Sequence, residues 1–166
     1  MGDVLLAEHA DPQVLERNPK TGKALTKGDR RLQVLQEWLG YSLLPDGRFQ
    51  KFLLMVGEGS NGKGVIQNLW VRMLGEQNVA HVSLDQLSER FALQPLLGKM
   101  ANICGDLCEI DAVAEGVLKR LTGQDNITVD VKNRPAVTMA PTVKLVFATP
   151  LPTSLALAIS LSQKRC

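Results

Sequence analysis

The sequence lacks several features that would place it in a specialised class of protein. No apolar run approaches the ~20 residues that a membrane-spanning helix needs, so we expect no membrane segment. The three cysteines, Cys104, Cys108 and Cys166, show no CxxC spacing, which favours reduced thiols over a disulfide framework or a zinc site. A net charge of only +2 provides no general attraction to nucleic acid. Any polyanion site must therefore be a local patch.

The amino terminus also lacks the pattern of a secretory signal. The residues after Met1 do not lead from a basic region into a long apolar one, so we expect a cytoplasmic protein. What remains is an ordinary globular composition: 166 residues, of which 45% are apolar and 22% are charged. This length and composition predict one compact domain.

The apolar pattern predicts an α/β fold with a parallel sheet flanked by helices. We expect a polar lead-in at residues 1–30, a core at 31–149 and an atypical tail at 150–166. Two β-rich runs, at 127–131 and 136–139, flank a polar turn and predict a β-hairpin before the last strand. Runs typical of buried strands occur at 52–56, 79–82, 100–104 and 143–148, and helical spacing occurs at 29–40, 65–74 and 112–121.

A glycine-rich segment between the strand at 52–56 and the next helix is the strongest chemical signal. It contains the GxxxxGK pattern of a nucleotide-binding phosphate loop, in which backbone N–H groups curl inward ahead of a helix N-terminus. Lys63 would reach the β and γ phosphates. The alternative is a glycine-rich turn with a solvated lysine. The predicted nucleotide-binding residues are Gly57, Glu58, Gly59, Ser60, Asn61, Gly62, Lys63, Gly64 and Val65.

Gly64 departs from the phosphate-loop pattern, because a Ser or Thr after the lysine normally ligates Mg²⁺. The metal would then depend on carboxylates and water. Asp106 follows the strand at 100–104 and Glu109 lies three residues on. We predict that Asp106 holds Mg²⁺ through water, and that both carboxylates act with Lys63 as catalytic residues. The alternative is that both carboxylates only favour the positive end of the next helix.

Three segments resemble the helicase domain of phage and plasmid primase-helicases, the D5-like and P4-like proteins of helicase superfamily 3. They lie at 53–63, 101–107 and 118–125, and the similarity extends over about residues 32–149. The resemblance implies an AAA+-like P-loop NTPase fold with ATP and Mg²⁺ as cofactors. It also implies a homo-oligomeric ring, usually a hexamer, that unwinds DNA 3′-to-5′ during replication in a bacterial or phage-infected cytoplasm.

The same resemblance implies a set of DNA-binding residues. Lys119 and Arg120 fall in the motif that couples nucleotide to DNA in such proteins, and Lys132 and Arg134 would lie at the hairpin tip, facing the channel. Paired cations at a tip suit the backbone phosphates of single-stranded DNA. The alternative for the hairpin is a solvated turn.

The end of the sequence departs from the family pattern. The family's sensor strand typically ends in Asn, often as Asn-x-Leu-Pro, whereas this chain has Ala148 and Thr149 before Pro150, and no arginine finger can be assigned after it. We therefore expect a truncated or frameshifted chain that forms the ATP-binding and ATP-hydrolysing core of a replicative DNA helicase. Two alternatives stay open: a small P-loop phosphotransferase, and a non-catalytic remnant that only binds nucleotide or helicase subunits.

Overall fold

The computed structural model describes residues 4–5, 27–57, 62–105 and 112–149. Six predicted site residues lie outside these ranges: Glu58, Gly59, Ser60, Asn61, Asp106 and Glu109. The helices and strands are β1 (Val4–Leu5), α1 (Lys27–Tyr41), β2 (Leu53–Val56), α2 (Lys63–Leu74), β3 (Val79–Ala80), β4 (Ala101–Cys104), α3 (Ala112–Thr122), β5 (Ile127–Val129), β6 (Val137–Met139) and β7 (Lys144–Thr149). Three short 3-10 helices, η1 (Glu76–Asn78), η2 (Gln86–Ser88) and η3 (Gln94–Leu96), connect them.

The main sheet has the strand order β1-β2-β7-β4-β3. Strands β2, β7, β4 and β3 are parallel, which confirms the predicted α/β architecture, and β7 pairs with β2 on one side and β4 on the other. β1, which the sequence did not predict, pairs antiparallel with β2. Strands β5 and β6 form the predicted hairpin, with Thr128 opposite Thr138. The last strand in the sequence therefore lies at the centre of the sheet.

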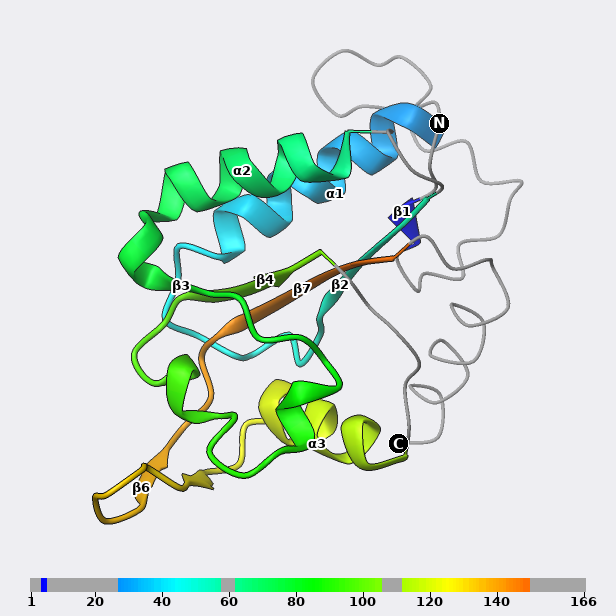
Figure 1. Cartoon of the computed structure of the whole chain (residues 1–166). Helices are drawn as coiled ribbons and strands as arrows, with labels where there is room; N and C mark the ends of the chain where they lie inside the picture. Colours follow the sequence, from blue (N-terminus) through cyan, green and yellow to red (C-terminus); the bar gives the residue numbers. More distant parts are fainter. Residues whose placement is uncertain (1–3, 6–26, 58–61, 106–111, 150–166) are drawn as a thin grey trace.

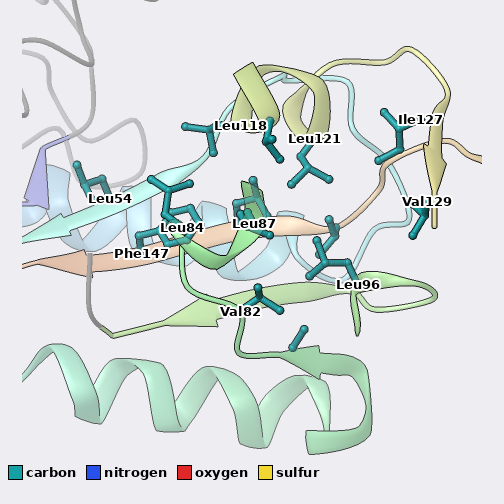
Figure 2. Packing of buried hydrophobic residues seen from close by; sticks show 14 of the residues in the cluster. Leu54, Val82, Leu84, Leu87, Leu96, Leu118, Leu121, Ile127, Val129 and Phe147 are labelled. Atoms are coloured by element: carbon teal, nitrogen blue, oxygen red, sulfur yellow. The ribbon is translucent and has the colours of Figure 1, made fainter. Parts of the chain in front are cut away.

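Helices cover both faces of this sheet (Figure 1). Because side chains alternate along a buried strand, each strand supplies both faces. On one face, Met55 and Val146 pack with Trp38 of α1 and Trp70 of α2. On the other face, Phe147 packs with residues of α3, η2 and the hairpin; the labelled members are Leu54, Val82, Leu84, Leu87, Leu96, Leu118, Leu121, Ile127 and Val129 (Figure 2). Two apolar layers thus hold the parallel strands between helices.

A buried lysine fixes the start of β7. The Nζ atom of Lys144 donates hydrogen bonds of 2.7 Å to the carbonyl oxygens of Leu44 and Thr142, and it lies 4.5 Å from the centroid of the Tyr41 ring. Two carbonyl acceptors and an aromatic face compensate a charge that is taken out of water. This contact joins the loop after α1 to the sheet.

Among the described residues, no helix combines the length and the apolar character needed to cross a membrane.

Candidate functional site

The connection from β2 to α2 brings the predicted phosphate-loop lysine back to the strand. Gly57 is buried at the end of β2, and its N–H donates a 3.1 Å hydrogen bond to the carbonyl oxygen of Thr149 in β7. Gly62 precedes α2 with a φ of 87°, a left-handed conformation that favours glycine. Lys63, the first residue of α2, donates from Nζ to the carbonyl oxygen of Gly57. The lysine side chain therefore closes the loop that carries it.

Three parallel strands end at the same edge of the sheet as this loop. Cys104 and Thr149 are the last residues of β4 and β7, and Gly57 directly follows β2. In open α/β sheets, ligands bind in the crevice outside the carboxyl ends of the strands. The N-terminus of α2, with the positive end of the helix dipole, lies at this edge. The arrangement therefore suits an anion.

The start of α2 leaves room for such an anion. A Cβ atom built on Gly62 or Gly64 would meet no heavy atom within 4 Å, and Val65 is 72% exposed. The described residues here therefore fit phosphate groups. They do not supply a metal site by themselves, because the described part of the chain contains no group of three or more His, Cys, Asp or Glu side chains that could hold an ion. A metal ion would depend on the predicted carboxylates of Asp106 and Glu109, which lie outside the described residues.

Two side chains that the sequence did not single out bind the end of β4. The Nε2 atom of Gln67 donates to the carbonyl oxygen of Cys104 at 3.3 Å, and the Nδ1 atom of His81 lies 2.8 Å from the carbonyl oxygen of Ile103. Gln67 stands four residues after Lys63, and this spacing could have identified it, because side chains at i and i+4 share a helix face. No local pattern points to His81.

A second candidate site is an open groove beside the hairpin. Its volume is about 470 Å³, within the range of small-ligand sites. The Arg90 guanidinium lies over the Phe91 ring at 4.9 Å and reaches the Asp130 carboxylate at 3.9 Å. Phe91 and Asn133 both have a positive φ, of 67° and 60°. The groove is lined by Arg90, Phe91, Asp130, Val131, Asn133, Arg134 and Pro135.

The predicted DNA-binding residues lie on two elements. Lys119 and Arg120 are exposed in the last turn of α3 and do not line the groove. Lys132 and Arg134 are exposed in the hairpin turn, and Arg134 lines the groove. The backbone N–H of Lys132 donates to the Gln94 side chain at 3.0 Å, which fixes the turn against η3. The structure therefore joins Arg134, but not the helix cations, to the groove.

Residues 55–157 match the model of a family described as "Family of unknown function (DUF5906)". The match covers more than half of the 166 residues and includes the end of β2, the connection to α2 and all of α2. The chain belongs to this family. No curated protein matches the sequence.

The fold of this family member is similar to that of a solved structure, "The apo structure of NrS-1 C terminal region (305-718)". The TM-score is 0.62 at 16% sequence identity, over 74% of this chain and 30% of that chain. A second structure, the A form apo structure of NrS-1 C terminal region-CTR, has a TM-score of 0.46 at 18% identity, over 57% of this chain and 22% of that chain. The first likeness shows a shared fold. The chain spans less than a third of the NrS-1 region that it matches.

Proposed function

We propose that this chain is the ATP-binding core of a DNA helicase of the superfamily 3 type, which hydrolyses ATP with Mg²⁺ and acts on single-stranded DNA as part of a homo-oligomeric ring. The observation that carries the proposal is the geometry between β2 and α2. A left-handed glycine, Gly62, directly precedes the helix, and Lys63 donates from its side chain to the carbonyl oxygen of Gly57.

Charge explains why this geometry suits a triphosphate. The positive dipole end of α2 and the Lys63 ammonium lie at one edge of the sheet, and together they attract the negative charge of phosphate groups. When bound, Mg²⁺ would neutralise phosphate charge and activate the attacking water. Asp106 would hold the metal through water, and Glu109 would serve the attacking water.

The groove beside the hairpin supports the DNA part of the proposal. Arg90, Arg134 and Phe91 line the groove, and Lys132 is exposed in the hairpin turn beside Arg134. Among the residues that line the groove, Asp130 is the acidic one, so positive charge exceeds negative charge there. Cations that follow a backbone, combined with an aromatic platform for bases, are typical of sites for single-stranded nucleic acid. The hairpin precedes β7, so it lies at the end of the sheet opposite to the end of β2 and the start of α2 (Figure 1).

Titration calorimetry with an ATP analogue that is not hydrolysed tests the nucleotide site. Lys63→Ala should lower the affinity by ~10- to 100-fold, since hydrogen bonds from a charged group contribute ~1.5–3 kcal/mol each. Lys51→Ala removes an exposed lysine before β2 and should leave the affinity unchanged. An unchanged affinity in Lys63→Ala would overturn the assignment.

Turnover assays separate the proposed helicase from its two alternatives. ATP hydrolysis that single-stranded DNA stimulates, without a small-molecule acceptor, supports the helicase. Release of ADP only in the presence of an acceptor supports a phosphotransferase. Nucleotide binding without turnover, even after mixing with intact helicase subunits, supports a non-catalytic remnant.

A further inference from the structure

α2 binds the ends of two different strands through side chains one helical turn apart. Lys63 donates to the carbonyl oxygen of Gly57 after β2, and Gln67 donates to the carbonyl oxygen of Cys104 at the end of β4. Residues at i and i+4 lie on the same helix face, so both contacts come from the face turned toward the sheet edge. The helix that carries the phosphate-site lysine therefore also holds the end of β4.

The other side of this strand end is held by side chains as well. The register of β3 with β4 ends at Ala80 opposite Asn102. Beyond it, the buried Asn102 side chain accepts from the N–H of Val82 and donates to its carbonyl oxygen, both at 2.8 Å. The Nδ1 atom of His81 lies 2.8 Å from the carbonyl oxygen of Ile103, and Nδ1 must donate because a carbonyl oxygen only accepts.

We propose that Gln67 is a positioning residue that keeps the end of β4 in place relative to Lys63. This inference rests on the proposed nucleotide site. The Gln67 amide also lies near Gly105, because a Cβ atom built on Gly105 would be 3.7 Å from its Oε1 atom, an ordinary van der Waals distance. Gln67 therefore binds the last residue of β4 and lies near the residue that follows it.

The effect of this contact should be specific to the metal-bound nucleotide. The carboxylates proposed for the metal follow Cys104 within five residues of sequence, whereas the phosphate groups depend on the start of α2. If the end of β4 shifts relative to Lys63, phosphate binding persists but the nucleotide and the metal are no longer held together. A misplacement of about 1 Å at such a site can cost ~100-fold in function.

The experiment measures the affinity of the full chain for a non-hydrolysable ATP analogue with Mg²⁺ and with EDTA. Gln67→Met keeps the side-chain length and removes the amide. We expect its affinity in EDTA to stay within about twofold of wild type, and the gain from Mg²⁺ to fall at least about fivefold. Gln67→Glu keeps the shape, loses the donor and places a carboxylate against a carbonyl oxygen, so its loss should be larger.

The matched control is Asn68→Leu, which removes an exposed amide from the neighbouring position of α2 and should retain the full Mg²⁺ gain. Amide hydrogen exchange provides a second measurement, and Gln67→Met should speed exchange at residues 103–105. Faster exchange or lower thermal stability with an unaltered Mg²⁺ gain would show a merely structural role and overturn the inference.

The proposed function and this inference can fail separately. If Lys63→Ala lowers the nucleotide affinity as expected while Gln67→Met keeps the full Mg²⁺ gain, the nucleotide site stands and the positioning role is wrong. A wild-type chain whose nucleotide affinity does not respond to Mg²⁺ also overturns the positioning role. If wild type binds no nucleotide, both fall together.

Discussion

The ammonium group of Lys63 and the carbonyl oxygen of Gly57 are hydrogen-bonded across the glycine-rich loop, although the two residues are six positions apart in the sequence. The contact ties the first residue of α2 to the residue that follows β2. It depends on Gly62, whose left-handed conformation turns the chain into the helix. The lysine can therefore reach the loop only while this turn keeps its geometry.

Replacement of Gly62 by alanine should weaken nucleotide binding. A Cβ atom there meets nothing within 4 Å, so the cost comes only from the positive φ, about 1–2 kcal/mol. The helix start will shift to relieve this strain, and we expect a nucleotide affinity ~5- to 30-fold lower by calorimetry. Gly40→Ala is the control, because Gly40 of α1 has equally open space without a positive φ and lies outside the nucleotide site, so it should bind nucleotide like wild type. Equal affinities of the two variants would contradict this account.

Restoration of a hydroxyl after the lysine should strengthen the response to metal. Gly64→Ser places a side chain in open space at the second residue of α2, where the phosphate-loop pattern has its metal ligand. We expect tighter binding of the ATP analogue with Mg²⁺ and unchanged binding in EDTA. The helix itself should gain ~0.5 kcal/mol or less, measured by urea unfolding, because serine has a higher helix propensity than glycine. A Mg²⁺ response identical to that of Gly64→Ala would rule out a ligand role for this position.

The groove beside the hairpin predicts two different effects on single-stranded DNA binding. Phe91→Ala should lower affinity by about 1–3 kcal/mol, since it removes a platform for base stacking. Arg134→Ala should weaken binding at low salt and reduce the slope of log K against log salt concentration by ~0.7, since it removes one phosphate contact. Fluorescence anisotropy with a labelled oligonucleotide measures both. Arg72→Ala, at an exposed position of α2, is the matched control and should bind normally.

The stability of the fold should depend on pH through Lys144. Burial lowers the pKa of this lysine below its usual 10.5, and the nearby carboxylate of Asp46 partly opposes the shift. Between the lowered folded pKa and 10.5, the unfolded chain binds more protons than the folded chain, so this group makes stability rise with pH. Burial raises the pKa of Tyr41, which acts in the opposite direction above pH 10.0.

Comparison with Lys144→Met isolates this contribution. Tyr41 and Asp46 are present in both proteins, so their shared effects largely cancel in the difference between the two unfolding free energies. Urea unfolding from pH 7 to 10.5 should show the stability of wild type rising relative to that of Lys144→Met as the pH increases. A difference that stays constant, or that falls with pH, would show that Lys144 does not titrate differently in the two states.

Local sequence patterns predicted most individual elements. The apolar runs around Leu54, Ile103 and Phe147 became β2, β4 and β7, and the polar turn at Lys132–Pro135 joined two strands as expected. Each of these predictions depends only on the polarity of a few residues that are neighbours in the sequence. β1 has only two residues, and it is a strand because it pairs with β2. Two residues are too few for an alternating or apolar pattern that would predict a strand.

The sequence by itself determined the loop chemistry: glycines at 57 and 62, a lysine at 63 and a following amphipathic helix all act within one short stretch of chain. Only the tertiary structure placed β7 between β2 and β4, because strand order depends on long-range packing of both sheet faces. The same packing brought Gln67 to Cys104 and Phe91 to the hairpin turn. Contacts between residues so far apart in the chain depend on how the helices pack on the sheet, so no spacing along the sequence predicts them.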